Sequence, residues 1–349
     1  MLFITHELSL NGAVISLLQQ ARRMRANGHD VTILTPALSG AAAALEGEFR
    51  ETGADVVTRV FASQHDVAVA CTIFTAGPLE DMVGRLPTVW WIHEGRVGVG
   101  HLIRQPPLMR MLGRVDKVIF PGRAVVEGVW AAMLGDLPPG RVAVIPNIIP
   151  PPPLTQAIAR PPGRARVICV GSIYPRKRQV DLVRAVAMLP GAPVQCVLVG
   201  QHVRLDPPGE EIIRAHPDRY VLTGGLQPDA LHAWYQSSDV FCLPSADECM
   251  PLTPIEAAWH GVPVVLSDLE CHQDFWRHGV NALIHPVGDV QILAWCLNLL
   301  LESPSLRARL AGAGRAVTSR FTEPSVGPLF DAALRDAIAT FGAASPLPR

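Results

Sequence analysis

The sequence predicts an α/β protein built from two Rossmann-like, doubly wound domains, each a parallel sheet covered by helices. Short apolar runs alternate with longer amphipathic patterns along most of the chain, which is the order of β-α-β units. A run of four prolines at residues 150–153 interrupts this alternation, which restarts after it. The length of 349 residues also fits two domains of about 150 residues each.

The first domain is predicted to begin with a strand over residues 1–5 and an amphipathic helix over 13–27. Gly28 ends this helix, because glycine readily adopts the left-handed conformation of a helix stop. Further apolar runs have the character of strands, with helical patterns between most of them. They cover residues 31–35, 67–73, 88–93, 117–120 and 142–145.

The prolines at 150–153, followed by Pro161, Pro162 and Gly163, mark a domain boundary, because such a stretch cannot continue a sheet or a helix. We therefore expect a first domain over residues 1–154 and a second over 163–323. In the second domain we expect strands over 166–170, 194–199, 220–222, 239–243 and 262–266, and helices over 180–189, 229–236 and beyond 289.

Composition excludes several classes of protein. The net charge is −1, from 30 basic and 31 acidic residues, so nucleic acid is not an expected partner. The seven cysteines contain no CxxC pair, and Cys169, Cys196 and Cys242 lie in strand-like runs typical of a reduced core. The chain starts without a signal-peptide pattern and has no apolar run of the ~18 residues that a membrane span needs. We expect a soluble, cytoplasmic protein.

Several common catalytic motifs are absent from the sequence. There is no GxxxxGK[ST] phosphate loop, no complete GxGxxG, and no GxSxG nucleophile elbow. No Asp-x-Asp pair and no HExxH is present, so we expect neither a catalytic metal nor a cofactor.

The strongest local pattern is residues 245–265, where a loop after a strand leads into a helix and then into another strand. Glu248 lies in the loop and Glu256 in the first turn of the helix. The loop amides could bind a diphosphate, and a glutamate there could accept hydrogen bonds from ribose hydroxyls. Alternatively, Thr253, Pro254 and Glu256 form a capping box, and Glu248 is a solvated loop charge.

A second candidate site follows the strand 166–170. Gly171 permits a close approach of the backbone, and Arg176, Lys177 and Arg178 are consecutive cations before a helix. The chain contains only one other lysine, Lys117, so Lys177 indicates a position that requires a compact charge. The alternative is a solvated basic turn.

The first domain offers two weaker candidates. Gly12, after Asn11 and between the first strand and the first helix, could let helix amides face a phosphate or a sugar, although Asn11 or Gly12 could simply cap that helix. His93 ends a strand, where ligands of parallel sheets bind, although a lone histidine is usually structural.

Together these residues resemble the family 4 retaining glycosyltransferases, and the resemblance covers nearly the whole chain. It depends on the order and spacing of its parts: Gly12-Ala13, the step at 28–31, His93, the segment from Val170-Gly171 to Lys177, Glu248 and Glu256 separated by seven residues, and the strand entry at 261–265.

The resemblance implies the GT-B fold, with two facing domains and a cleft between them. It implies transfer of a sugar from a UDP-, GDP- or ADP-type nucleotide sugar, with retention of configuration and without a metal. Lys177 would neutralise the diphosphate with Gly171 and Arg176 nearby, and Glu256 would bind the ribose. Glu248 and the backbone of Met250, Leu252 and Thr253 would hold the donor sugar and phosphate. His93 would lie beside the reacting centre, with Gly12 near the phosphates or acceptor, and a last helix over 324–342 would cross back to the first domain.

The chain departs from the family pattern at three positions, one of which is Val14, where some members have Pro and no consequence is evident. Ser172 stands where many members have Arg, a role that Arg176 could take, and Pro251 stands where many have Gly, which removes an amide donor. Because of Ser172 and Pro251, a non-catalytic nucleotide-sugar-binding protein remains an alternative to the transferase. A sugar-nucleotide epimerase, which can share the two-domain architecture, is a second alternative.

A local charge imbalance bears on the acceptor. Between Arg96 and Arg123 there are six cations and one acidic residue, Asp116, with leucines, methionines and an isoleucine between them. Such a segment can lie on an anionic membrane, which would favour a lipid-linked acceptor and a location at the inner face of the membrane. The alternative is an ordinary basic surface whose apolar residues face the core.

Overall fold

The computed structural model describes residues 1–36, 38–153, 155–189, 193–201 and 205–344, and they form two compact units. Unit 1 comprises Met1–Ile149 and the chain from Arg320 onward, and unit 2 comprises Pro150–Ser319. Unit 2 therefore starts at the four prolines. The expected end of the first domain, residue 154, lies outside the described residues.

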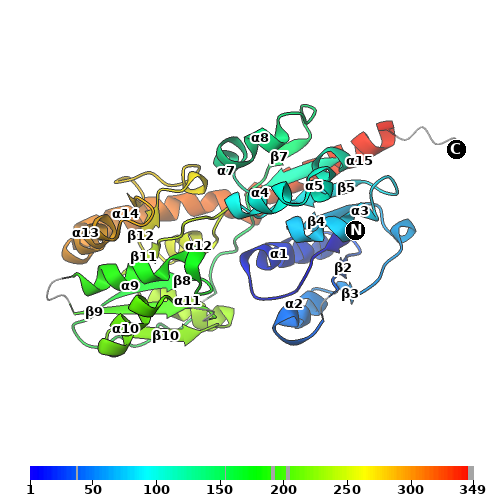
Figure 1. Ribbon diagram of the computed structural model, residues 1–349. Helices are drawn as coiled ribbons and strands as arrows, with labels where there is room; N and C mark the ends of the chain where they lie inside the picture. Colours follow the sequence, from blue (N-terminus) through cyan, green and yellow to red (C-terminus); the bar gives the residue numbers. More distant parts are fainter. Residues whose placement is uncertain (37, 154, 190–192, 202–204, 345–349) are drawn as a thin grey trace. The chain divides into compact units, whose positions relative to one another are not determined.

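Unit 1 contains a parallel sheet with the strand order β3-β2-β1-β4-β5-β6-β7 (Figure 1). Every residue of β1, β4, β5 and β6 is buried, as expected for a parallel sheet that is covered on both faces. The strands are β1 (Leu2–Ile4), β2 (Thr32–Leu34), β3 (Asp55–Val57), β4 (Ala68–Cys71), β5 (Thr88–Trp91), β6 (Lys117–Phe120) and β7 (Val142–Val144).

Helix α1 (Gly12–Ala26) shows how the sequence sets the helices of unit 1. The Asn11 side chain accepts a hydrogen bond from Val14 N at 3.0 Å and so caps the helix. Gly28, with φ of 84°, lies just beyond the end of the helix, as predicted. The other helices are α2 (Glu46–Glu51), α3 (Ala76–Glu80), α4 (Arg96–Ile103), α5 (Pro106–Met109), α6 (Met111–Arg114), α7 (Arg123–Val125), α8 (Ala131–Leu134) and α15 (Glu323–Ala344), with short turns η1 (Gly40–Ala43), η2 (Ala62–Gln64), η3 (Ile73–Thr75) and η4 (Val126–Trp130).

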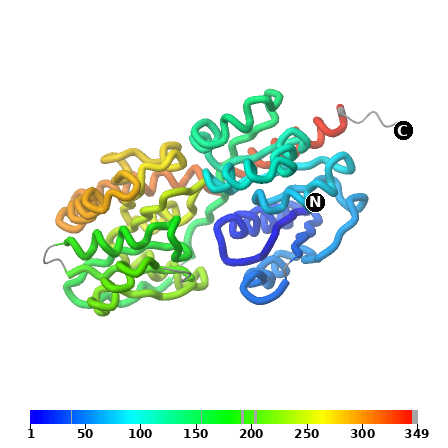
Figure 2. The backbone as a smooth tube through the Cα atoms, viewed as in Figure 1, coloured from blue at the N-terminus to red at the C-terminus, as the bar shows by residue number. Residues whose placement is uncertain are grey.

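Helix α15, drawn in red in Figure 2, belongs to unit 1 although it is the last helix of the chain. It contacts β5 and β6, and its buried side chains join the core of that unit. Two ion pairs fasten its outer side: Arg23 to Asp331, and Lys117 Nζ to Asp336 Oδ2 at 2.9 Å. The side chains that α15 adds to the core are Val326, Phe330, Ala333, Leu334 and Ala337.

Unit 2 contains a second parallel sheet with the order β10-β9-β8-β11-β12-β13. Cys169, Cys196 and Cys242 are buried in its strands, as predicted. The strands are β8 (Ala165–Val170), β9 (Val194–Val199), β10 (Tyr220–Gly224), β11 (Val240–Leu243), β12 (Val264–Ser267) and β13 (Leu283–His285). The helices are α9 (Gln179–Ala187), α10 (Pro207–Ala215), α11 (Pro228–Gln236), α12 (Thr253–Trp259), α13 (Val290–Glu302) and α14 (Pro304–Val317), with turns η5 (Pro175–Lys177) and η6 (Glu270–His272). The turn η7 (Thr318–Phe321) includes the point at which the chain passes from unit 2 to unit 1.

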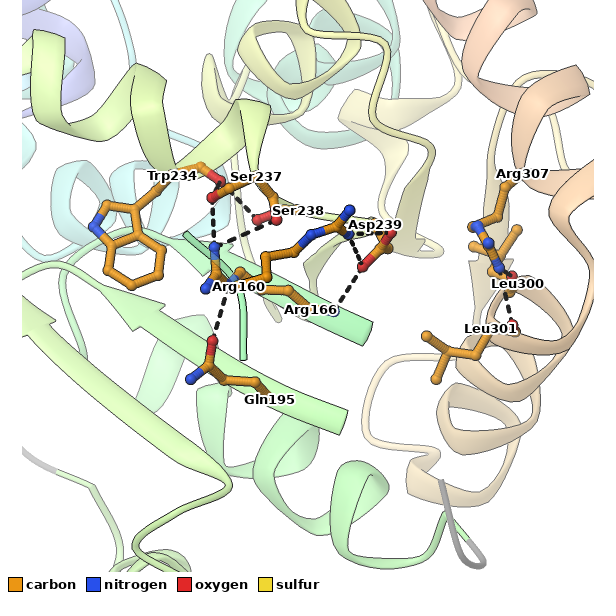
Figure 3. A network of polar contacts seen from close by, with 10 residues as sticks. All are labelled: Arg160, Arg166, Gln195, Trp234, Ser237, Ser238, Asp239, Leu300, Leu301 and Arg307. Carbon is orange, nitrogen blue, oxygen red and sulfur yellow. Dashed lines mark hydrogen bonds and ion pairs between the residues drawn. The ribbon is translucent and has the colours of Figure 1, made fainter. Parts of the chain in front are cut away.

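A buried arginine fastens the end of α11 to the sheet of unit 2 (Figure 3). Arg166 on β8 is 2% exposed, and its Nε donates to Gln195 Oε1 at 2.9 Å. Its Nη1 donates to Ser237 Oγ at 2.6 Å, and its guanidinium carbon lies 4.7 Å from the centroid of the Trp234 ring. Because its donors are satisfied, this buried charge fixes the last turn of α11 in place.

Candidate active site

The carboxyl ends of β8 and β11 carry the cations and the carboxylate that the sequence analysis selected. Lys177, the last residue of η5, donates from Nζ to Glu248 Oε1 at 2.5 Å. Arg176 Nη1 lies 3.8 Å from Glu248 Oε2, and the Glu248 side chain is only 8% exposed. Glu248 is therefore a buried, paired carboxylate, so its reading as a solvated loop charge is wrong.

The charge of Glu248 is set by these two cations. Burial acts to raise the pKa of Glu248, but Lys177 and then Arg176 outweigh it and lower that pKa below its ordinary value. The carboxylate is therefore ionised at neutral pH. It can accept hydrogen bonds from a ligand while it neutralises part of the charge of Lys177.

Arg176 holds the loop after β8 to the loop after β11. Its Nη1 donates to the carbonyl oxygen of Asp247, its Nη2 donates to Tyr174 Oη, and its own carbonyl accepts from Ala246 N at 2.8 Å. With these contacts, Arg176 fastens the loops around Lys177 and Glu248. In this structure the guanidinium is engaged by protein oxygens.

Two glycines let the ends of β8 and β9 approach each other closely. Gly171 has φ of 146°, and the Lys177 side chain passes over it, 3.6 Å (Cε) from where a Cβ would lie. At Gly200, with φ of 148°, a Cβ would lie 2.3 Å from the Gly171 carbonyl oxygen, a distance that no side chain could occupy. Gly171 was predicted, whereas Gly200, which follows β9 directly, was not.

Helix α12 does not contain the expected capping box. The helix starts at Thr253, and its N-cap position is Leu252, whose φ and ψ of −75° and −36° are already helical. No side chain caps it, and Glu256 N instead donates to Leu252 O at 3.0 Å. Because the helical geometry begins one residue earlier than predicted, Thr253 is not in the extended conformation that an N-cap requires. The capping-box interpretation of Glu256 is wrong.

The Glu256 carboxylate is instead held by Tyr235 on α11, which donates from Oη to Oε2 at 2.9 Å. Burial raises the pKa of Glu256, and the tyrosine hydroxyl opposes that rise. Tyr235 is fully buried, and its ring stacks on His260 with centroids 5.6 Å apart. His260 Nε2 in turn lies 2.9 Å from His232 Nδ1. Tyr235 was not among the predicted site residues, although a buried tyrosine generally needs a partner for its hydroxyl.

The backbone segment expected to hold the donor lies between these two glutamates. Met250 and Leu252 are 7% and 6% exposed, and Thr253 is half-buried at the first position of α12. The apolar side chains of Met250 and Leu252 are used for packing, so any contact of these two residues with a ligand would come from their backbone, as predicted.

The unit 1 candidates follow strands of its own sheet. His93 follows β5, its ring packs on Trp91 with centroids 4.5 Å apart, and its buried Nε2 has no hydrogen-bond partner among the residues that the structure describes. Burial lowers the pKa of His93 to about 3, so the ring is neutral at neutral pH. Gly12 is the exposed first residue of α1, and Asn11 is the residue that caps the helix. Within the described ranges, no three His, Cys, Asp or Glu side chains are grouped to hold a metal ion.

The two units match two consecutive family models. Residues 1–131 match the model described as Glycosyl-transferase family 4, and residues 153–317 match that of Glycosyl transferases group 1. Each unit therefore matches a glycosyltransferase model, and each match covers less than half of the chain. These two matches confirm the resemblance to the family 4 glycosyltransferases that the motifs indicated.

Several curated glycosyltransferases are similar to parts of this chain. The lipopolysaccharide core biosynthesis glycosyltransferase LpsE of Rhizobium meliloti is 30% identical over 187 residues, 52% of this chain and 50% of that protein. A D-inositol 3-phosphate glycosyltransferase of Thermobispora bispora is 29% identical over 246 residues, 62% of this chain and 56% of that protein. The matched segments span about half the length of these relatives.

Solved glycosyltransferase structures share the fold along nearly the whole chain. HepE of Anabaena, in complex with UDP and glucose, has a TM-score of 0.76 at 19% identity and covers 96% of this chain and 98% of its own. Sucrose-phosphate synthase of Thermosynechococcus elongatus has a TM-score of 0.76 at 19% identity, with 99% of both chains covered. The fold class predicted from the sequence, GT-B with two Rossmann-like domains, is confirmed.

Proposed function

We propose that this protein transfers a sugar from a nucleoside-diphosphate sugar to an acceptor hydroxyl, with retention of configuration and without a metal. The observation that carries the proposal is the buried ion pair of Lys177 and Glu248 at the carboxyl ends of β8 and β11. An ammonium group has three donors, of which one is given to Glu248. The other two are suited to the oxygens of a leaving diphosphate.

In this proposal, the remaining unit 2 residues each bind a different part of the donor. Glu248 accepts hydrogen bonds from hydroxyls of the donor sugar, and Glu256, oriented by Tyr235, accepts from the ribose. The backbone of Met250, Leu252 and Thr253 and the close approach at Gly171 serve the phosphates. Arg176 contributes by holding the two loops together, and by adding positive charge beside Glu248.

His93 and Gly12 are the unit 1 contributions. Because His93 is neutral and no described residue bonds its Nε2, it can accept a hydrogen bond from a sugar hydroxyl or donate one in its other tautomer. Gly12 leaves the first turn of α1 open to a phosphate or acceptor.

In the proposed reaction, the bond between the anomeric carbon and the diphosphate breaks, and a bond to the acceptor oxygen forms on the same face of the sugar. The departing diphosphate oxygen takes the proton of the acceptor hydroxyl.

A thermal-shift screen with UDP, GDP and ADP tests nucleotide binding, with UDP as the first choice because related structures hold it. A nucleotide at 100 times its dissociation constant should stabilise the folded protein by about 2.7 kcal/mol. Slow hydrolysis of the matching nucleotide sugar without an acceptor would support the transferase. Interconversion of donor sugars would support an epimerase, and binding without turnover a non-catalytic protein.

We also propose that the acceptor is lipid-linked, and that unit 1 docks on the anionic inner face of the membrane from the cytoplasm. In the basic segment, Val97, Ile103 and Met109 are 55%, 60% and 38% exposed, and Arg104 and Arg110 are exposed beside them. Leu108 is half-buried, Leu102, Met111 and Leu112 are buried, and Lys117 is buried against Asp336. The surface for a bilayer is therefore α4 and α5 and not the whole segment. Among the described residues no helix could cross a membrane.

Sedimentation with phosphatidylglycerol-containing liposomes at low and high salt tests this docking. Arg104→Glu with Arg110→Glu should abolish sedimentation, because each cation near such a surface contributes about 1 kcal/mol. The control is the double variant Arg59→Glu with Arg85→Glu, which makes the same change in charge at two exposed arginines elsewhere in unit 1. This control should still sediment with the liposomes. Equal binding to neutral vesicles would contradict docking by charge.

A further inference from the structure

Three neighbouring strands of unit 1 end at an exposed cluster of aromatic rings, which we call the aromatic platform (His6, Phe74 and His101). His6 follows β1, Phe74 lies on η3 after β4, and His101 lies on α4 after β5, and these strands are adjacent in the sheet. The Phe74 ring centroid is 5.3 Å from that of His6 and 5.1 Å from that of His101. Phe74 is nevertheless 51% exposed, so about half of this large apolar side chain is open to solvent.

A strained turn presents Phe74. Thr72, which follows β4, has φ of 77° and ψ of 160°, a region that is almost restricted to glycine and costs about 1–3 kcal/mol. The turn is held by its surroundings, because the Thr72 carbonyl accepts from Trp90 Nε1 at 2.8 Å and from Thr75 Oγ1 at 2.7 Å. Thr72 Oγ1 also lies 3.1 Å from His6 Nδ1. A strained backbone conformation of this kind persists only where the surrounding structure holds it, and such conformations are most frequent at ligand sites and active sites.

A hydrogen-bond acceptor lies beside the rings. Glu7, adjacent to His6, is 30% exposed, and its Oε1 accepts from Ser9 Oγ at 2.7 Å and Asn11 Nδ2 at 3.0 Å. Its Oε2 takes no hydrogen bond from the described residues and is available to a ligand. Burial lowers the pKa of His6, against the opposing effect of Glu7, so His6 is uncharged at neutral pH. The platform is thus apolar on its face and carries a negative charge at its rim.

We propose that the aromatic platform binds a pyranose ring of the acceptor, with the C–H face of the sugar on Phe74 and a sugar hydroxyl donating to Glu7 Oε2. This rests on the proposed transferase function. A sugar combines an apolar face with hydroxyls at its edge, which is the complement of these residues. The carboxylate of Glu7 disfavours a phosphate or an anionic lipid headgroup at the same place. A single exposed ring between two imidazoles is also too small for an acyl chain or a protein interface.

Saturation-transfer NMR with methyl α-glucopyranoside, methyl α-mannopyranoside and methyl β-galactopyranoside, each with saturating UDP, tests the platform. We expect sugar signals for at least one of them in the unmodified protein. Phe74→Ala should reduce these signals roughly fivefold or more, the scale of one aromatic contact, and Phe74→Trp should retain them. The matched control is Phe61→Ala, which removes another exposed phenylalanine of unit 1 (74% exposed) and should change nothing.

Glu7→Gln provides a second variant. The amide can still accept from Ser9 and Asn11 but loses the charge that strengthens a bond to a sugar hydroxyl, so signals should fall by a smaller factor. Calorimetry with UDP, GDP and ADP separates this proposal from the proposed function. A protein that binds no nucleotide overturns the proposed function. Nucleotide binding with equal sugar signals in Phe74→Ala and Phe61→Ala, or with none in the unmodified protein, overturns the platform alone.

Discussion

At the scale of single residues, Glu256 depends on a partner from another helix. Its carboxylate accepts from the buried hydroxyl of Tyr235, while α11 itself is fixed at its end by Arg166. A half-buried carboxylate that accepts one hydrogen bond from the described residues retains acceptor capacity for a ligand. This arrangement gives Tyr235 the role of a positioning residue for the proposed ribose contact.

Tyr235→Phe should raise the donor KM about tenfold or more with little change in kcat, because a hydrogen bond to a charged group is worth about 1.5–3 kcal/mol. Tyr220→Phe is the matched control, since its buried hydroxyl donates to Val183 O at 3.0 Å but lies on β10. Both variants should lose stability, and only Tyr235→Phe should raise KM. Equal kinetics in the two variants would show that Tyr235 does not position Glu256 for the donor.

Glu256→Gln should also raise the donor KM, without lowering the melting temperature.

Lys177→Ala should depress transfer severely, but the structure shows that it also leaves Glu248 buried beside a single, more distant cation. The double variant Lys177→Ala with Glu248→Gln should regain stability and not activity. Lys177→Arg should restore activity only partly, because a planar guanidinium differs in shape from a compact ammonium. Kinetics and urea unfolding of the three variants check this, and full activity in Lys177→Arg would refute the need for a point charge.

At the scale of elements, the sequence indicated most of the strands because a parallel sheet buried on both faces leaves continuous apolar runs. It missed β3 and β13, each three residues long, because Asp55 and His285 break their apolar pattern and the strands are defined by pairing with β2 and β12. The prediction of a capping box at Thr253 was wrong for a similar reason. Local spacing matched the motif, but the chain was already helical at Leu252. Gly200 and Tyr235 were not predicted as site residues, because their roles depend on contacts with residues distant in the sequence.

Gly200→Ala should destabilise unit 2 and weaken donor binding together. Its Cβ would meet the carbonyl of Gly171 at 2.3 Å and Ser172 N at 2.9 Å, and both are backbone atoms that can move only with the loop. Overpacking of this kind costs typically about 1–3 kcal/mol. Gly225→Ala is the control, because its Cβ would meet only Gln201 Cγ at 3.4 Å. Melting temperature and nucleotide affinity should both fall in the first variant and stay nearly constant in the second.

At the scale of the whole molecule, buried histidines make stability depend on pH. Burial lowers the pKa of His93 to about 3 and that of His260 to about 4, and it also lowers the pKa of four others: His6, His232, His272 and His285. The unfolded chain therefore binds more protons below pH 6.5, so the stability present above 6.5 is lost as pH falls toward 4. Glu256, whose pKa is raised, opposes this by at most one proton.

The midpoint of urea unfolding should accordingly decrease steadily from pH 7 to pH 5. Each histidine that stays neutral only in the folded state contributes at most about 1.36 kcal/mol per pH unit, and less where it is partly exposed. Carboxylates held ionised, such as Glu248, add to the loss only below about pH 4.5. A midpoint that stays constant over this range would show that these rings are protonated in the folded protein.

The last helix makes unit 1 depend on a segment more than 170 residues away from the rest of its chain. Phe330 is fully buried in that core beside Trp91, with ring centroids 5.4 Å apart. Phe330→Ala should cost about 3–5 kcal/mol of the stability of unit 1. Hydrogen exchange should then accelerate in peptides from residues 1–149 and not in those from 164–319, and nucleotide binding by unit 2 should persist. Phe241→Ala, which empties a buried site on β11, should produce the opposite pattern. Uniform acceleration along the chain in both variants would mean that the two units unfold as one, and that α15 couples them instead of completing unit 1.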